Sequence, residues 1–388
     1  MSKKYLYGLL AVLIVAATVL SACGPAATPT EVATQAPVET QAPVATQAPA
    51  TQAPATSLVG VILPTKDEPR WLQDQAVFQK AGWEPLFSQG DSAKEKANVE
   101  ALISQGVKVI IICPQDASAA AAAAEEARAA GVKVISYDRL IRDTTAVDYY
   151  VTFDSFAVGA AWSDYLIQQA GTTKGNPLYL YAGAASDNNA FIFFEGAWEK
   201  IQPKIVDGTF VIKNSDKAVG LQTNAKLTRD QESTIIGQIT TDWKFDVAKN
   251  LAESNLTKAT KADKGTVYIL APNDGTARAI ADAFGADKDV TKYYITGQDA
   301  EKASVQYIID GKQSMTVFKD VRTLAADAVA AANAFISGAT PDSTTTYNNG
   351  KIDVPAKPSA IVTVTKDNVK AALIDSGYYQ ASDFTGLP

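Results

Sequence analysis

The pentapeptide Gly-Val-Lys-Val-Ile occurs twice in this chain and constrains the fold more than any other feature. It begins at Gly106 and again at Gly131, each time where a helical pattern ends and an apolar run begins. Such runs are typical of buried parallel strands, and two parallel strands in succession need a helical crossover between them. Coincidence in a chain rich in alanine and valine is the alternative, but the repeat takes the same place in both units. We therefore predict an α/β fold with a parallel sheet.

The alternation of strands and helices occupies two successive parts of the chain. In the first part, apolar runs separated by helical patterns predict strands at residues 59–63, 84–87, 107–113 and 132–137. After residue 154 the alternation starts again, with strands expected at residues 178–182, 210–213, 267–271, 293–296 and 315–318. This pattern predicts two α/β lobes. The first lobe comprises residues 58–153 plus about 320–345, and the second comprises residues 154–319 plus about 346–388.

The amino-terminal residues predict export from the cytoplasm. Lys3 and Lys4 precede an uncharged stretch that ends in Leu-Ser-Ala-Cys at Cys23, which is the pattern of a secretion signal over residues 1–23. A membrane-spanning anchor is the alternative, since about 18 uncharged residues just suffice to cross a bilayer. The tetrapeptide resembles the lipobox of bacterial lipoproteins, which implies lipidation of Cys23 and an extracytoplasmic, membrane-anchored protein. Residues 24–57 repeat Thr-Gln-Ala-Pro and predict a disordered tether.

Composition excludes several classes of function. The formal net charge is -7, and no basic run follows Lys4, so a nucleic-acid partner is not expected. The chain has no histidine, which rules out Ser-His, Cys-His and histidine–metal arrangements. Cys113 ends an apolar run, and we expect it to be a buried, inert thiol. We predict neither a metal nor a cofactor.

Several predicted strands end in the same kind of polar residues. The pairs or groups that follow them are Asp138-Arg139, Asp187-Asn188-Asn189, Asn273-Asp274, Gln298-Asp299 and Lys319. Ligands of open α/β sheets bind at the carboxyl ends of the strands. Each residue alone is equally typical of a turn or a helix cap, so the argument depends on their recurrence.

The residue types at these strand ends suit a neutral polyol. Forked and multi-point donors and acceptors can bracket vicinal hydroxyl groups. The cations Arg70, Arg139 and Lys319 roughly balance the anions Asp138, Asp187 and Asp299, which disfavours a charged ligand.

Two tryptophans in predicted loops, Trp71 after Arg70 and Trp243 after Asp242, provide flat faces for a pyranose ring. Packing onto the core is the alternative for both. Trp162 and Trp198 lie within helical patterns and are expected in the core.

Five motifs together resemble the sugar-binding receptors of bacterial ABC importers. They are Arg70-Trp71, the segment from Ser136 to Ile141, Asp187-Asn188-Asn189-Ala190, Gly297-Gln298-Asp299-Ala300 and the segment from Thr316 to Lys319. The resemblance implies a type I periplasmic-binding fold, in which two Rossmann-like lobes joined by a three-segment hinge close on an aldose such as xylose or glucose. It implies sugar-binding roles for Arg70, Trp71, Asp138, Arg139, Asn188, Asn189, Trp243, Asn273, Asp299 and Lys319, with Trp243 matching less securely than the others.

The implied function is capture of a neutral monosaccharide by a monomeric lipoprotein that delivers it to an ABC permease. A sugar-sensing co-receptor for a membrane sensor would share every one of these residues. Glycoside hydrolysis by paired carboxylates, such as Asp138 and Asp299, is a third possibility. It is disfavoured because the neighbouring cations keep both groups ionised, whereas a general acid needs a raised pKa.

Overall fold

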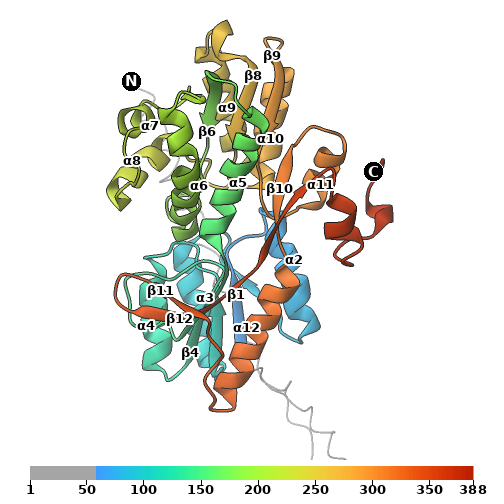
Figure 1. The fold of residues 1–388 in the computed structure, drawn as a ribbon. Helices are drawn as coiled ribbons and strands as arrows, with labels where there is room; N and C mark the ends of the chain where they lie inside the picture. The colour runs from blue at the N-terminus through green and yellow to red at the C-terminus, as the bar shows by residue number, and fades with distance from the viewer. Residues whose placement is uncertain (1–57, 388) are drawn as a thin grey trace, which may run out of the picture. The chain divides into compact units, whose positions relative to one another are not determined.

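The computed structural model describes residues 58–387, and its first sheet has seven strands (Figure 1). Their order is β11-β12-β5-β4-β3-β1-β2. Adjacent strands are parallel from β12 through to β2, whereas β11 pairs antiparallel with β12. The bounds are β1 (Val59–Leu63), β2 (Leu86–Phe87), β3 (Val109–Ile112), β4 (Lys133–Tyr137), β5 (Tyr149–Phe153), β11 (Thr345–Asn348) and β12 (Asp353–Ser359).

Helices cover both faces of this sheet, because alternate residues of its strands point to opposite sides. Val109 and Ile111 of β3 pack in one hydrophobic cluster, and Ile110 and Ile112 pack in another. The covering helices are α2 (Pro69–Lys80) and α12 (Val321–Ile336) on the first side, and α3 (Ser92–Ser104) and α4 (Ala120–Ala129) on the second. Cys113 lies in the first cluster and is fully buried, as predicted.

The second sheet is parallel, with the order β7-β6-β8-β9. Its strands are β6 (Asn176–Leu180), β7 (Phe210–Ile212), β8 (Gly265–Leu270) and β9 (Val290–Ile295). A parallel bridge between Gln298 and Val317 brings β10 (Met315–Lys319) alongside, and β10 pairs antiparallel with β13 (Ile361–Thr365). The helices of this lobe are α5 (Ser155–Ala170), α6 (Asn188–Val206), α7 (Asp216–Leu221), α8 (Arg229–Ile239), α9 (Phe245–Lys258), α10 (Asp274–Ala286) and α11 (Lys302–Ile309). Trp162 and Trp198 are buried in its core, as predicted.

The chain crosses between the lobes three times, and the third crossing corrects the predicted boundary. β5 leads into α5 at Asp154, β10 leads into α12 at Asp320, and β12 leads into β13 at Ala360. Residues from about 346 were expected in the second lobe, but β12 hydrogen-bonds to β5, and β11 to β12. Residues 345–359 therefore extend the first sheet, since the edge of β5 leaves its backbone groups open to a further strand.

In both sheets the chain adds strands first on one side of an interior strand and then on the other. This strand order places a binding crevice at the interior strand of each sheet. In the first lobe β2 lies on one side of β1 and β3 on the other, and in the second lobe β7 and β8 flank β6. Loops diverge at such switch points and leave a crevice at the carboxyl ends of the strands. The predicted two-lobed parallel α/β fold is confirmed. Within residues 58–387 no helix has the length and apolar character needed to cross a membrane, and the predictions for residues 1–57, including Cys23, lie outside the described part.

Candidate functional site

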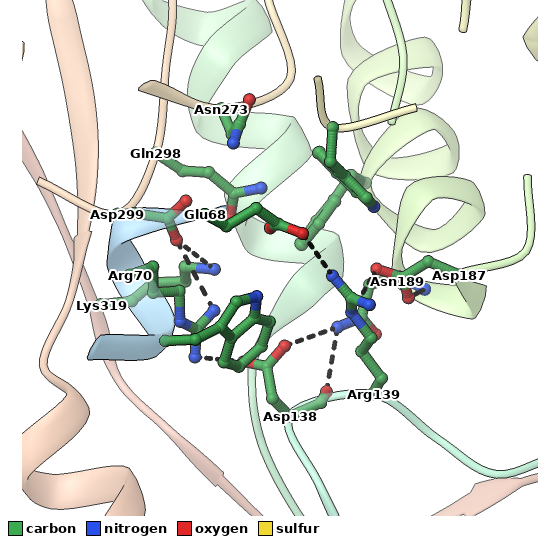
Figure 2. Close-up of a pocket in the computed structure, with 13 residues that line it drawn as sticks. Glu68, Arg70, Asp138, Arg139, Asp187, Asn189, Asn273, Gln298, Asp299 and Lys319 are labelled. Atoms are coloured by element: carbon green, nitrogen blue, oxygen red, sulfur yellow. Dashed lines mark hydrogen bonds and ion pairs between the residues drawn. The ribbon is translucent and has the colours of Figure 1, made fainter. Parts of the chain in front are cut away.

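A small pocket lies where the carboxyl ends of the two sheets meet, and Figure 2 shows charged side chains converging on it. The side chains leave little room between them in this form: the free space, open solvent included, is about 280 Å³. Its walls come from both lobes: Glu68, Arg70, Trp71, Asp138, Arg139, Asp187, Asn189, Phe193, Trp243, Asn273, Gln298, Asp299 and Lys319.

The start of helix α2 delivers Arg70 and Trp71 to the pocket. Pro69 occupies the first turn, where its missing N–H costs no hydrogen bond and its ring fixes a helical φ. Glu68 occupies the cap position without capping the helix, and its carboxylate lies 3.6 Å from the Arg139 guanidinium instead. The sequence Glu-Pro-Arg-Trp therefore places three functional groups within four residues at one edge of the sheet.

The turn after β4 holds Asp138 and Arg139 in a conformation that few residues adopt. Asp138 has a φ of 59°, in the left-handed region. Its carbonyl oxygen accepts hydrogen bonds from the Tyr150 hydroxyl at 2.7 Å and the Thr152 hydroxyl at 3.0 Å. The Ser136 hydroxyl donates to the Arg139 carbonyl at 2.6 Å. These bonds offset the strain of the turn, and such strain is typical of functional sites.

Ion pairs connect the two lobes across the pocket (Figure 2). From the first lobe, Arg70 lies 2.6 Å from Asp138 and 3.6 Å from Asp299 of the second lobe. Arg139 lies 2.9 Å from Asp187, which also belongs to the second lobe. Lys319 pairs with Asp299 at 2.8 Å. Because these contacts need both lobes together, the structure represents the closed form of the cleft.

Burial and neighbouring charges separate the pKa values of the pocket carboxyls. Burial opposes ionisation of Asp138, but Arg70, Lys319 and Arg139 outweigh it and hold its pKa below the usual value. Burial raises the pKa of Glu68 to about 7, and Arg139 offsets only part of that effect. Burial likewise raises the pKa of Asp187, although Arg139 opposes it. At neutral pH the anions and cations of the pocket nearly balance, which disfavours binding of a charged ligand.

Two second-lobe residues serve both as helix caps and as pocket walls. The Asp187 carboxylate accepts from the Asn189 backbone N–H at 2.8 Å at the start of α6, and its other oxygen faces Arg139. The Asn273 side-chain oxygen accepts from the Thr276 N–H at 3.2 Å at the start of α10. Figure 2 shows the Asn273 amide nitrogen on the pocket side. A donor thus remains available to a ligand.

Aromatic side chains and unpaired polar atoms complete the pocket. Trp71 has its ring 4.5 Å from the Arg70 guanidinium and 5.1 Å from that of Arg139. Trp243 meets Phe193 edge to face at 6.3 Å, and a side chain at Gly183 would collide with its indole. Among residues 58–387, the buried indole nitrogens of both tryptophans and the Gln298 side-chain oxygen have no hydrogen-bond partner. These three atoms are free to hydrogen-bond a ligand.

Nine of the ten residues predicted to bind ligand line this pocket, and Asn188 does not. Its side-chain oxygen accepts from Arg142 at 3.0 Å and Arg229 at 3.2 Å, beside the site. Asn188 and Asn189 are consecutive helical residues, which point about 100° apart, and it is Asn189 that faces the pocket. Asn188 therefore lies beside the pocket in this structure, and its role in sugar binding stays a prediction.

Four lining residues were missing from the predicted set: Glu68, Asp187, Phe193 and Gln298. Asp187 and Gln298 belong to the strand-end motifs and could have been included. Phe193 lies four residues after Asn189 in α6, so helical spacing would have found it. No pattern distinguishes Glu68 from an ordinary residue before a proline.

Comparisons with known proteins agree with this geometry. Residues 59–340 match the family model described as a periplasmic binding protein domain. The multiple sugar-binding periplasmic protein of Azospirillum brasilense is 34% identical over 84% of this chain and 90% of its own length. The D-xylose-binding periplasmic protein of Escherichia coli is 30% identical over 81% of this chain and 88% of its own.

Solved structures extend the similarity. A carbohydrate transporter solute-binding protein from Chloroflexus aurantiacus, in complex with D-glucose, is 71% identical with a TM-score of 0.85, over 86% of this chain and 100% of its own. An ABC transporter solute-binding protein from Clostridium phytofermentans, with bound β-D-glucose, is 31% identical with a TM-score of 0.75, over 84% of this chain and 99% of its own. The chain belongs to the periplasmic binding protein family, as the sequence resemblance predicted.

Proposed function

We propose that this protein captures a neutral aldose, such as glucose or xylose, between its lobes and delivers it to an ABC sugar importer. The observation that carries the proposal is the pocket itself. Its forked donors and acceptors are nearly balanced in charge, and it contains unpaired polar atoms beside two tryptophans. The relatives whose names or complexes specify a sugar support the same ligand class.

Each part of the pocket has a role in this proposal. Arg70, Asp138, Arg139, Asn189, Asn273, Asp299 and Lys319 hydrogen-bond the hydroxyl groups of the sugar, and Glu68, Asp187 and Gln298 join them. Trp71 and Trp243 cover the C–H faces of the ring. Contacts to both lobes at once favour the closed form, so sugar binding and closure are coupled.

Isothermal titration calorimetry with xylose, glucose, galactose and arabinose tests the proposal. We expect saturable 1:1 binding to at least one aldose and no measurable binding to glucuronate, whose carboxylate would add an unpaired anion to a balanced pocket. Absence of binding to every one of the neutral sugars would refute the proposal.

We further propose that the protein does not hydrolyse glycosides, although Glu68 provides a carboxyl with a raised pKa of about 7. Hydrolysis also needs a second carboxylate free to act as nucleophile or base. Asp138 is held by Arg70 at 2.6 Å, and Asp299 by Lys319 at 2.8 Å. Release of phenol from aryl glycosides, abolished by Asp299→Ala, would contradict this proposal.

We also propose that Cys23 carries a lipid that anchors the monomeric protein outside the cytoplasm, on the sequence pattern Leu-Ser-Ala-Cys alone. Radiolabelled palmitate should be incorporated into the full chain and not into the Cys23→Ala variant. Incorporation into both would assign the lipid elsewhere.

A further inference from the structure

The carboxyl-terminal segment, residues 366–387, lies beyond the residues that match the family model, yet it packs against the second lobe. It includes a π-helical turn (Lys370–Ile374) and a 3₁₀ turn (Ala381–Asp383). Val369, Leu373 and Phe384 form a hydrophobic cluster with Phe318 of β10 and with α11. Figure 1 shows this segment, in red, beside α11.

Two tyrosines of the segment reach across to the first lobe. The Tyr378 hydroxyl donates to the side-chain oxygen of Gln73 in α2 at 2.6 Å. The Gln73 side-chain nitrogen donates to the Tyr379 hydroxyl at 3.0 Å. The Tyr379 hydroxyl in turn donates to the Ala300 carbonyl at 2.9 Å. Burial raises the pKa of both tyrosines, so the hydroxyls stay protonated as this chain of donors requires.

Both ends of this hydrogen-bond chain adjoin charged residues of the pocket. Gln73 follows Arg70 by three residues and lies near it on the same helix. Ala300 follows Asp299, and both have positive φ, 49° and 97°, which costs free energy unless the surroundings hold them. The Tyr379 hydroxyl provides such a restraint on the turn. Arg70 and Asp299 themselves lie 3.6 Å apart across the cleft.

The segment also packs beside Lys319, the third cation of the pocket after Arg70 and Arg139. The Tyr378 ring meets the Phe318 ring edge to face at 4.6 Å, and Lys319 follows Phe318 in β10. The same pair of tyrosines therefore contacts the first lobe through Gln73 and supports the backbone beside Asp299 and Lys319.

We propose that Gln73 and Tyr379 are positioning residues for sugar binding: their hydrogen bonds hold Arg70 and Asp299 in register across the cleft and slow its opening. This inference rests on the proposed function of sugar capture. A purely structural role in fastening the carboxyl terminus would instead change the stability of the ligand-free protein and leave release of the sugar unaffected.

Stopped-flow measurement of glucose binding and release, with Tyr379→Phe, Gln73→Met and the double variant, tests the proposal. Each single change removes two neutral hydrogen bonds, one of them the shared bond between Gln73 and Tyr379. Each should therefore raise the dissociation rate constant about fivefold or more, with little change in the association rate constant. The double variant should release sugar more slowly than the product of the two single effects predicts, because both changes remove the bond between Gln73 and Tyr379.

Tyr293→Phe is the matched control, since its hydroxyl donates to the Lys312 carbonyl at 3.0 Å within the second lobe. The proposal would be overturned if Tyr379→Phe released glucose at the wild-type rate. It would also be overturned if the variant lost ligand-free stability without releasing glucose faster. If the wild-type protein binds no aldose, the proposed function fails instead. Hydrogen exchange then tests the hydrogen-bond chain alone: Tyr379→Phe should accelerate exchange at residues 299–301, and unchanged exchange would overturn it.

Discussion

Arg139 joins carboxylates of both lobes with an aromatic ring of the pocket. It lies 2.9 Å from Asp187 and 3.6 Å from Glu68, and its guanidinium lies over the Trp71 ring. Truncating one partner of a buried charged pair costs about 2–5 kcal/mol. We expect Arg139→Ala to weaken glucose binding by roughly 30-fold or more. Ligand-free stability should change little, since Asp187 belongs to the other lobe and becomes hydrated when the cleft opens.

Arg142→Ala is the matched control for this prediction. Arg142 contacts Asn188 at 3.0 Å and does not line the pocket. Calorimetry and thermal denaturation of both variants check the expectation. Unfolding of Arg139→Ala at ordinary temperature would show that the residue is structural.

Glu68 should make closure of the cleft depend on pH. In the closed form its pKa is raised to about 7 by burial, with Asp299 and Asp187 adding to the effect and Arg139 and Arg70 opposing it. On opening, hydration should return the pKa toward about 4.3. Between about pH 4.3 and pH 7 the closed form therefore holds a proton on Glu68 that the open form has released. Raising the pH through this range weakens closure, and the contribution of Glu68 to closure is lost above about pH 7.

Glucose affinity should therefore fall about tenfold between pH 5 and pH 8, a moderate effect because the Glu68 side chain stays 18% exposed. The Glu68→Gln variant should show a nearly flat profile. Calorimetry across this pH range provides the measurement, and identical profiles for variant and wild type would assign the titration to another group.

At the scale of residues, the sequence predicted which kinds of side chain form the pocket better than it predicted which individual residues line it. The strand-end pattern identified Asp138, Arg139, Asp299 and Lys319, because polar residues at the ends of parallel strands converge at one edge. It did not separate Asn188, which lies beside the pocket, from Asn189, which lines it, because the rotation at the first turn of α6 depends on where the helix starts. It omitted Glu68, whose role arises only from the approach of Arg139 and the second lobe.

At the scale of elements, helices α5 and α6 cross so closely that only glycine fits at their contact. A Cβ at Gly159 would lie 1.8 Å from the Phe193 carbonyl oxygen, and one at Gly196 would lie 2.1 Å from that of Phe156. We expect Gly159→Ala to lower the free energy of unfolding by about 3 kcal/mol, because neither backbone can yield locally. The displaced α6 would also carry Phe193 away from the pocket.

Gly237→Ala in α8 is the matched control, since its Cβ would meet no atom within 4 Å. This change should stabilise the protein by about 0.5–1 kcal/mol through the helix propensity of alanine. Urea denaturation of both variants makes the comparison. Equal stabilities would mean that the helices can separate without cost.

Most elements could be predicted from periodicity, but the sheet that β11 and β12 join could not. Apolar runs located β3 and β4 because both are buried on two faces. The apolar pattern of the tail after residue 345 does not specify which sheet edge it joins. The structure assigns β12 to β5 of the first lobe, so the third crossing falls near residue 360.

At the scale of the whole molecule, three short connections at Asp154, Asp320 and Ala360 join the lobes. The contacts across the cleft that involve pocket residues are polar: Arg139 with Asp187, Arg70 with Asp299, and the Asn189 side-chain nitrogen with the Asp138 carbonyl at 2.9 Å. Hydrogen bonds of Gln73 with the two tyrosines and of Arg142 with Asn188 join the lobes beside the pocket. A lobe interface of this kind permits relative motion unless a ligand adds contacts to both sides.

We therefore expect the ligand-free protein to be open in solution and glucose to close it. Small-angle X-ray scattering should show a smaller radius of gyration with saturating glucose than without it. At a glucose concentration 100 times the dissociation constant, binding should also add about 2.7 kcal/mol to the free energy of unfolding, visible as a higher melting temperature. Arg139→Ala at the same glucose concentration should show a smaller decrease in radius, because it binds glucose more weakly and lacks the cation that pairs with Asp187 across the cleft. A wild-type radius that glucose leaves unchanged, while calorimetry detects binding, would mean that the cleft is already closed without ligand.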